Sequence, residues 1–165
     1  MVSKVETNPV DFTDFGALHA LLSAAFAPME GRIDPPSSMT RLSVADVAAK
    51  VRDEDLFVMF DGARPVACLF GAVKGEVYYI GKLAVAAGHR GRGLSRRLVE
   101  EAARHASGLG HPTLELQTRV ELTSNHAVFR ALGFEEVART AHPGHSRPTS
   151  ITFRRPGRNS GGARG

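Results

Sequence analysis

YIGKLAVAAGHRGRGLSRRL, residues 79–98, is the stretch that decides the fold of this chain. Its first half is typical of a strand and ends in the apolar triplet Leu83-Ala84-Val85. Its second half is a tight turn, Arg90-Gly91-Arg92-Gly93, that leads directly into a helix. Glycines let a backbone approach a ligand closely, a helix N-terminus presents free N–H groups and positive potential, and arginines add full charges. The stretch therefore predicts a site for anionic phosphate groups.

The length and composition bound the class of protein. The chain has 165 residues, 42% of them hydrophobic and 23% charged, so we expect one globular domain with its own core. No apolar run reaches the roughly 20 residues of a membrane-spanning helix. The first six residues, MVSKVE, lack the apolar segment of a signal peptide, so we expect a cytoplasmic protein and no membrane partner. The one cysteine, Cys68, lies in an apolar run and is interpreted as a buried strand thiol rather than a nucleophile.

The net charge of +4 comes from the C-terminal end of the chain. Residues 154–165 contain four arginines and no acidic residue, and without these four the 21 basic residues fall to 17, which equals the number of acidic ones. A nucleic-acid groove needs its basic excess on the domain itself, so this distribution argues against DNA or RNA as the main partner. Binding through the tail alone stays a weaker alternative. We predict a folded domain over residues 1–153 and a disordered basic tail over residues 154–165.

Before the central stretch, the pattern predicts two helices and three strands. Apolar residues at helical spacing predict a helix over 14–26, capped by Thr13 or Asp14, after a short edge strand within residues 3–10. A second helix is expected over 44–51, capped by Ser43. The loop between the two helices either covers the fold or selects a substrate. Strands over 56–60, 65–73 and 76–85 are joined by Asp-Gly and Lys-Gly turns, which predict an antiparallel meander.

After the glycine turn, the pattern alternates between helix and strand. An amphipathic helix is expected from Leu94 until the glycines at 108 and 110, followed by a strand over 113–118. A strand–helix–strand crossover of this kind predicts a parallel pair. A short helix over 124–132 and strands over 134–139 and 150–153 complete the domain.

These residues resemble the GCN5-related N-acetyltransferase (GNAT) family over about residues 1–153. The cofactor signature of that family corresponds to Arg90-Gly91-Arg92-Gly93-Leu94-Ser95, preceded by the strand that ends in Leu83-Ala84-Val85. Its second signature, a short helix that ends in Leu-Gly-Phe, corresponds to residues 125–134. The resemblance implies a mixed α/β (α+β) fold. Its central sheet is mostly antiparallel, with six or seven strands and one splayed parallel pair, and about four helices flank it.

Two other phosphate-binding folds fit these residues less well. A dinucleotide-binding fold requires a third glycine near position 96, where this chain has Arg, and alternating strands and helices from the N-terminus. A P-loop requires Gly-Lys-Ser or Gly-Lys-Thr at the end of the turn, and neither is present.

The resemblance implies acetyl-CoA as the co-substrate and assigns residues to it. The pyrophosphate is expected on the backbone N–H groups of Gly91, Arg92, Gly93, Leu94 and Ser95. Arg90 and Arg92 either neutralise it or the 3′-phosphate, or are solvated surface arginines. The pantetheine arm is expected along Leu83, Ala84 and Val85, hydrogen-bonded like an added strand, with the Val85 N–H as a candidate oxyanion donor. Asn125 either contacts the pantetheine arm or caps the short helix.

The proton-transfer residues are less clear than the cofactor site. Phe129 occupies the position at which the family signature has a tyrosine that protonates the leaving thiolate. Either the thiolate leaves unaided or another group protonates it, and Phe129 is expected only to pack against the cofactor. Glu76, Glu115 and Tyr79 are the candidate catalytic residues. The two glutamates are alternatively surface carboxylates, and Tyr79 alternatively only packs. His89 and His126 are further candidate bases, with surface positions as the simpler interpretation. His142 and His145 lack a third ligand nearby, so no metal is expected.

The resulting hypothesis is an acetyl-CoA-dependent N-acetyltransferase that acts on a primary amine by direct transfer in a ternary complex. The acceptor is a small-molecule or peptide amine that the sequence does not identify. A non-catalytic acyl-CoA-binding sensor or interaction module is the alternative, because Phe129 and a strand without a carboxylate both permit it. Closing strands in this family often support dimers, so a homodimer stays open.

Overall fold

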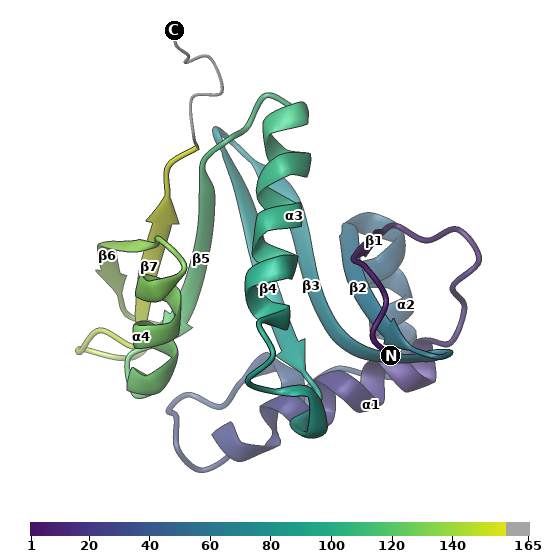
Figure 1. Cartoon of the computed structure of the whole chain (residues 1–165). Coiled ribbons are helices and arrows are strands. Elements are labelled where there is room, and N and C mark those ends of the chain that lie inside the picture. Colours follow the sequence, from purple (N-terminus) through teal and green to yellow (C-terminus); the bar gives the residue numbers. More distant parts are fainter. Residues whose placement is uncertain (158–165) are drawn as a thin grey trace, which may run out of the picture.

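A single seven-stranded sheet forms the centre of the computed structural model, which describes residues 1–157 except for the side chain of Thr40 (Figure 1). The strand order is β1-β2-β3-β4-β5-β7-β6. The strands are β1 (Glu6–Thr7), β2 (Asp55–Asp61), β3 (Arg64–Lys74), β4 (Val77–Val85), β5 (Leu114–Arg119), β6 (Glu135–Thr140) and β7 (Ser150–Arg155). The predicted meander is confirmed, because β2, β3 and β4 pair antiparallel in chain order. The edge strand predicted within residues 3–10 is only two residues long.

The parallel pair, β4 and β5, is joined over a short length only. Tyr78 pairs with Leu114 and Tyr79 with Glu115, and beyond these two pairs the strands diverge (Figure 1). We call the diverging region, residues 80–85 of β4 and 116–119 of β5, the splay. The splayed parallel pair predicted from the family resemblance is therefore confirmed.

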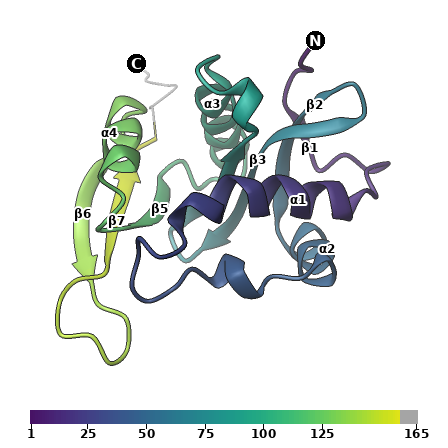
Figure 2. The ribbon, with the colours of Figure 1, turned by 90° about the horizontal axis from the view of Figure 1, so that it is seen from below.

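Helices cover the two faces of the sheet unequally. They are α1 (Phe15–Phe26), α2 (Val44–Asp53), α3 (Leu94–Gly108) and α4 (Thr123–Ala131), with short 3-10 turns η1 (Ala27–Met29), η2 (Ser38–Arg41) and η3 (Ala87–His89). In Figure 2, α1 and α2 lie on one side of the sheet and α3 and α4 on the other. The core accordingly forms two clusters, one between the sheet and α1 with α2, and one between the sheet and α3. Cys68 lies fully buried in the α1–α2 cluster, as its interpretation as a strand thiol predicts.

Local sequence accounts for where the helices begin. The Asp14 carboxylate accepts a hydrogen bond from the Ala17 N–H at 3.0 Å, which identifies Asp14 rather than Thr13 as the cap of α1. Ser43 and Asp46 form a reciprocal capping box at the start of α2. At α3, Gly93 occupies the cap position with φ 76°, and no side chain caps the helix. The first N–H groups of α3 therefore stay open to a ligand.

The C-terminal boundary extends further than predicted. Strand β7 continues through Arg154 and Arg155, two residues beyond the predicted strand end at Phe153. Arg154 pairs with Glu115 at 2.8 Å and Arg155 with Glu100 at 2.7 Å, so both arginines belong to the fold and not to a tail. The rest of the predicted tail, from residue 158, lies outside the described residues. Within residues 1–157, no helix has the length and apolar character needed to cross a membrane.

Candidate active site

The glycine turn is an open, rigidly shaped backbone surface. Gly91 and Gly93 both adopt left-handed conformations, with φ of 77° and 76°, which side chains rarely tolerate. A Cβ atom added at either position would meet nothing within 4 Å, so the surface beside the turn is free for a ligand. Arg90 and Arg92 are exposed on the same turn. Open backbone, free N–H groups and two cations at the start of a 15-residue helix form a surface that can bind an anion.

A buried histidine holds this turn against the β2–β3 hairpin. His89, at the end of η3, is 7% exposed, and its Nε2 lies 3.1 Å from Oδ2 of Asp61. The hydrogen bond from His89, together with the N-terminal ammonium, lowers the pKa of Asp61. His126 is also buried, with Nε2 at 2.9 Å from the Arg119 carbonyl oxygen. The interpretation of these two histidines as surface residues is therefore wrong, because tertiary contacts bury both.

Leu83, Ala84 and Val85 lie on β4 beyond its last pair with β5. Leu83 and Val85 are partly buried against the α3 core cluster, whereas Ala84 belongs to the α1–α2 cluster. The edge of β4 that faces β5 has no strand partner over these residues. Such an unpaired edge can accept an extended ligand as if it were a further strand.

Tyr79 and Glu115 meet at the root of the splay, where they form the last pair of β4 with β5. The Tyr79 ring lies 4.5 Å from the Lys74 ammonium. Burial raises the pKa of the Tyr79 phenol most, and the charge of Glu115 raises it further. A hydrogen bond from the Gln117 backbone N–H to the phenol oxygen lowers it in part. Glu115 has a 16% exposed side chain that is held by Arg154 Nε at 2.8 Å. These two candidate catalytic residues are therefore brought together.

Glu76, the third candidate, is not brought to the splay. It lies exposed in the turn before β4, and the chain passes through both paired residues, Tyr78 and Tyr79, before it reaches the diverging part of the strand. The side chain is thus at the closed end of the parallel pair. Glu76 is close to the diverging part of β4 in sequence but not in space, because an extended strand advances about 3.3 Å with each residue.

The short helix α4 presents Asn125 and Phe129. The N-cap is Leu122, so Asn125 is the third helical residue and its interpretation as a cap is wrong. Within residues 1–157, its side-chain amide has no hydrogen-bond partner. Phe129 is partly buried, with ring centroids 6.2 Å from Phe134 and 6.1 Å from Phe153. Phe129 therefore packs against other aromatic rings on the α3 side of the sheet, and its predicted contact with the cofactor stays a prediction.

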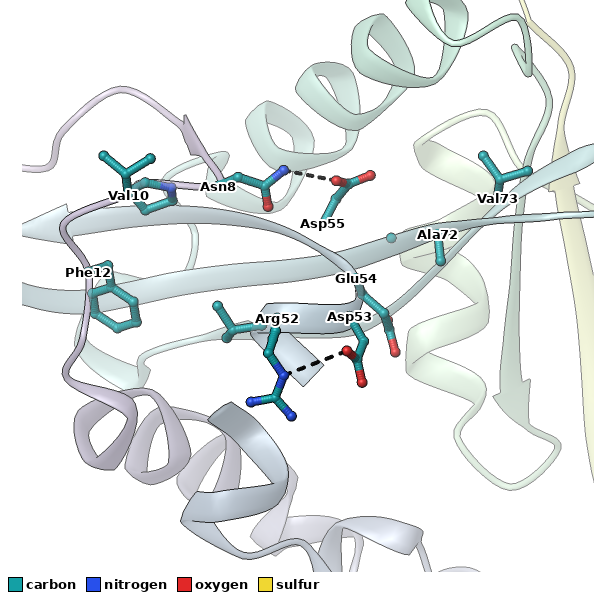
Figure 3. Close-up of a pocket in the computed structure, with 12 residues that line it drawn as sticks. Asn8, Val10, Phe12, Arg52, Asp53, Glu54, Asp55, Ala72 and Val73 are labelled. Atoms are coloured by element: carbon teal, nitrogen blue, oxygen red, sulfur yellow. Dashed lines mark hydrogen bonds and ion pairs between the residues drawn. The ribbon is translucent and has the colours of Figure 1, made fainter. Parts of the chain in front are cut away.

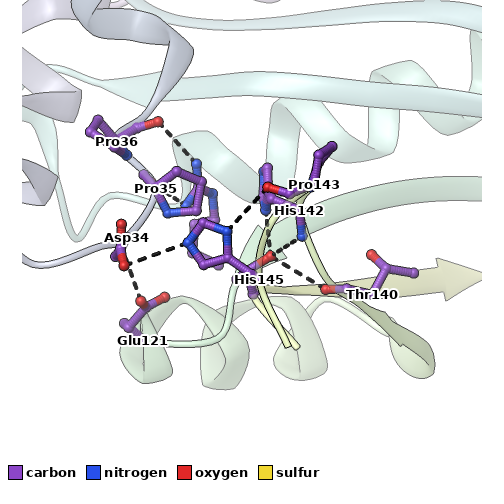
Figure 4. Close-up of polar contacts among 10 residues, drawn as sticks. Asp34, Pro35, Pro36, Glu121, Thr140, His142, Pro143 and His145 are labelled. Carbon is purple, nitrogen blue, oxygen red and sulfur yellow. Dashed lines mark hydrogen bonds and ion pairs between the residues drawn. The ribbon is translucent and has the colours of Figure 1, made fainter. Parts of the chain in front are cut away.

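The connection between α1 and α2 is tied to the far side of the splay (Figure 4). Arg119, the last residue of β5, donates to the carbonyl oxygens of Pro35 and Pro36. The Asp34 N–H donates to Glu121 at 3.2 Å, and the Asp34 carboxylate lies 3.5 Å from His145 Nε2. The connection therefore reaches across from the α1 side of β4 to β5 and to the β6–β7 loop. We call residues 27–43 the strap.

The two histidines of the β6–β7 loop make polar contacts with the protein. His142 Nδ1 contacts the Thr149 hydroxyl, and burial together with the charges of Arg119 and His145 lowers the His142 pKa. Among the described residues there is no group of three or more His, Cys, Asp or Glu side chains that could hold a metal ion.

Two cavities lie outside the splay. One, of about 610 Å³, lies between the chain before α1, the end of α2 and strands β2 and β3, with Asn8, Asp53, Glu54 and Asp55 in its wall (Figure 3). The other, of about 310 Å³, lies between α3 and α4 beside Arg96 and Arg155. Arg96 closes one side of it by donating to the Ala131 carbonyl oxygen at 3.1 Å. The second cavity is on the same face of the sheet as the glycine turn.

Lys82 is a further residue of the splay whose placement the strand pattern does not predict. It lies in the splay at a shift in the β3–β4 register between Cys68 and Phe70, with φ 54°. Its side chain reaches toward the strap, where Nζ lies 3.2 Å from Ser38 Oγ. The signal was a single charge inside the apolar run YYIGKLAV, which the strand pattern alone does not explain.

Comparison with known proteins gives the same fold. The chain resembles the crystal structure of the ribosomal-protein-S18-alanine N-acetyltransferase from Escherichia coli, with a TM-score of 0.67, 21% identity and 94% of each chain covered. It also resembles the IAA acetyltransferase from Bacillus cereus ATCC 14579, with a TM-score of 0.64, 19% identity, and 94% of this chain and 99% of that chain covered.

A third similar structure contains the expected co-substrate. It is a Bacillus anthracis str. Ames protein described as a streptothricin acetyltransferase in complex with acetyl coenzyme A, with a TM-score of 0.58, 15% identity and 62% of each chain covered. No curated protein matches the chain in sequence. The family model of the acetyltransferase (GNAT) family matches residues 17–134, which include β4, the glycine turn, α3 and α4. The chain therefore belongs to the GNAT family of acetyltransferases.

Proposed function

We propose that this protein transfers the acetyl group of acetyl-CoA directly to a primary amine while both substrates are bound. The observation that carries the proposal is the open glycine turn at the N-terminus of α3, next to the unpaired edge of β4. Membership of the GNAT family supports acetyl transfer, and a similar structure in complex with acetyl coenzyme A supports this co-substrate.

The residues of the turn fit the phosphate end of acetyl-CoA. The backbone N–H groups from Gly91 to Ser95 would bind the pyrophosphate, because two left-handed glycines leave the space beside them open. Arg90 and Arg92 would add charge. The free edge of β4 at Leu83–Val85 would hydrogen-bond the pantetheine arm, and the unpartnered Asn125 amide would contact it from α4.

Bound in this way, acetyl-CoA supplies an activated acetyl thioester to the splay. The Val85 N–H or a neighbouring one would donate to the carbonyl oxygen as negative charge develops there. The amine nitrogen forms the new N–C bond, the C–S bond breaks, and its electron pair leaves with the sulfur. Phe129 has no proton to give, so the sulfur leaves as a thiolate, which a thiol pKa near 8.5 makes tolerable.

The proton of the attacking amine would pass through water in the splay toward its root, because the six residue steps from Val85 back to Tyr79 span about 20 Å. The raised pKa of Tyr79 keeps its phenol protonated at neutral pH, so it would relay a proton rather than accept one permanently. Glu115, beside Tyr79, is the carboxylate in reach of that relay, and it accepts a hydrogen bond from Arg154 Nε at 2.8 Å. Glu76 has no part in this route, since it lies beyond the paired residues.

Direct transfer is favoured over a covalent acyl-enzyme. Cys68, the one cysteine, is fully buried, and burial raises its pKa to about 12. A thiol that is protonated and inaccessible cannot attack a thioester. The acetyl group therefore passes to the amine without an intermediate carrier on the protein.

Two measurements test the proposal. Isothermal titration with acetyl-CoA is expected to give a saturable heat, and absence of heat would sink the cofactor assignment. Thiol release, followed with a chromogenic disulfide over a broad panel of primary amines, is expected to rise above hydrolysis for at least one amine. Tight acetyl-CoA binding with no release for any amine would instead favour the second candidate, a non-catalytic acyl-CoA sensor. Phe129 and the lack of a carboxylate on β4 are the observations that favour that candidate.

A further inference from the structure

Lys82 has a backbone conformation that sets its side chain apart from the strand around it. The β3–β4 pairing slips at this point, and Lys82 takes φ 54°, a left-handed conformation that is uncommon outside glycine. Its carbonyl oxygen accepts a contact from Cys68 Sγ at 3.7 Å. The next residues are Leu83–Val85, so the irregularity lies directly before the edge proposed to hold the pantetheine arm.

Within the described part of the chain, the Lys82 ammonium has no counter-ion. Nζ lies 3.2 Å from Ser38 Oγ of the strap and 5.8 Å from the centroid of the Phe26 ring on α1. Among the described residues it has no carboxylate within ion-pairing distance. The nearby Glu54 carboxylate is taken by Lys50 at 2.7 Å. Burial and the Lys50 charge lower the pKa of Lys82, while Glu54 acts in the opposite direction.

The position of this cation is on the side from which an acceptor would enter. Its contacts are with α1 and the strap, whereas the glycine turn begins α3 on the opposite face of the sheet. Acetyl-CoA held on the α3 side leaves the α1 side of the splay for the amine. A half-buried ammonium without a partner carboxylate is stabilised when a ligand brings one.

We propose that Lys82 binds a carboxylate of the acceptor, so that the acceptor is an amino-acid-like molecule that carries a primary amine and a carboxylate. This inference rests on the proposed function, because it takes the splay as the place of transfer. Lys82 is then a specificity-determining residue. A general-base role for a neutral Lys82 is the competing assignment, and it predicts a loss of turnover with every amine, whether or not the amine carries a carboxylate.

Matched pairs of acceptors test the assignment. Thiol release is measured with L-phenylalanine against phenethylamine, L-tryptophan against tryptamine, and L-leucine against isoamylamine. The wild-type protein is expected to prefer the carboxylated member of a pair. Lys82→Met keeps the Cβ and an unbranched side chain that lacks only the terminal charged group, so the backbone strain is unchanged. It should raise KM for the amino acids roughly tenfold to a hundredfold, the range of a charge-assisted hydrogen bond, and leave the simple amines within about twofold.

Two further variants complete the design. Lys82→Glu is expected to reverse the preference within a pair, because it replaces the cation by an anion. Lys4→Met, at an exposed lysine near the edge of the sheet, should leave the preference unchanged. The proposal is overturned if the wild-type protein has equal kcat/KM for both members of every pair. It is also overturned if Lys82→Met lowers kcat/KM equally for both members.

A binding measurement separates this inference from the proposed function. Protein with and without saturating CoA is titrated with N-acetyl-L-phenylalanine and with N-acetylphenethylamine. If the wild-type protein binds the carboxylated ligand more tightly and Lys82→Met binds both ligands equally, the carboxylate site is supported even if no amine is turned over. Equal affinity of the two ligands overturns it, whether or not acetyl-CoA binds and reacts.

Discussion

Replacing Gly91 by glutamate or by glutamine separates charge from shape at the glycine turn. Both side chains enter the same open space, since a Cβ at this position meets nothing within 4 Å. Both also take on the same strain, because φ is 77° and a left-handed conformation costs a non-glycine residue about 1–2 kcal/mol. Any difference in acetyl-CoA affinity between the two variants therefore reports the charge alone.

The size of the difference follows from Coulomb's law. A carboxylate about 6 Å from one phosphate charge is repelled by about 0.7 kcal/mol in water, and by about 1.4 kcal/mol from the two charges of a pyrophosphate. That energy corresponds to about a tenfold difference in Kd, and the lower effective dielectric constant near a protein surface increases it. We expect Gly91→Gln to weaken binding moderately and Gly91→Glu to weaken it at least tenfold further.

Isothermal titration of acetyl-CoA at low and high salt is the assay. The gap between the two variants should narrow at about 1 M salt, where charges are screened within about 3 Å. Gly75 provides the control pair, because it has φ 60°, equally open surroundings and a place in the β3–β4 turn at the closed end of the sheet. Equal affinity of Gly91→Glu and Gly91→Gln, or the same gap at Gly75, would refute the assignment of the turn to phosphate binding.

Four other predictions concern the core, the strap and the thiolate. Tyr78→Phe removes the hydroxyl that donates to Asp55 at 2.7 Å and should lower the free energy of unfolding at neutral pH by about 1–2 kcal/mol. Burial alone would raise the Asp55 pKa, but hydrogen bonds from Tyr78 and Asn8 and the His105 charge lower it overall. The contribution of Asp55 to the free energy of unfolding is thus present above about pH 4 and is lost below it. Urea unfolding should therefore give a smaller difference in free energy of unfolding between wild type and Tyr78→Phe at about pH 3 than at neutral pH. An equal difference at both pH values would contradict the link between the Asp55 pKa and stability. Cys68, with its pKa raised to about 12, should not react with a chromogenic disulfide in the native protein and should react fully in guanidinium chloride; rapid native reaction would show that the strand opens. Arg119→Ala removes the hydrogen bonds to Pro35 and Pro36, so amide hydrogen exchange in residues 30–37 should become faster by mass spectrometry, and unchanged exchange would mean that other contacts hold the strap. Phe129→Tyr should leave kcat within about twofold, because a thiol with a pKa near 8.5 leaves unaided, whereas a rise of about tenfold would show that protonation of the thiolate limits the rate.

Much of the fold could be predicted from the sequence because its signals are local. The caps at Asp14 and Ser43 depend on residues three positions away, and the Gly62 and Gly75 turns join strands that are adjacent in the chain. The cofactor half of the candidate site is equally local. A strand, two left-handed glycines and a helix start follow one another within residues 83–95, although the contact of His89 with Asp61 also holds the turn.

The remaining features depend on residues that are far apart in the chain. His89 and His126 are buried by contacts with Asp61 and with the Arg119 carbonyl, and neither partner is marked in the sequence around the histidine. Arg154 and Arg155 looked like part of a tail, but pairing with β5 and ion pairs with Glu115 and Glu100 make them strand residues.

The sequence by itself determined the helix starts, the meander and the glycine turn proposed to bind phosphate, since residues close together in the chain specify each of them. Only the tertiary structure decided that β4 and β5 part after two residue pairs, that Glu76 lies away from the splay and Glu115 at its root, and that Lys82 turns toward the strap. Register slips and strand divergence are set by packing on both faces of the sheet at once. That balance belongs to the assembled core and not to any one segment.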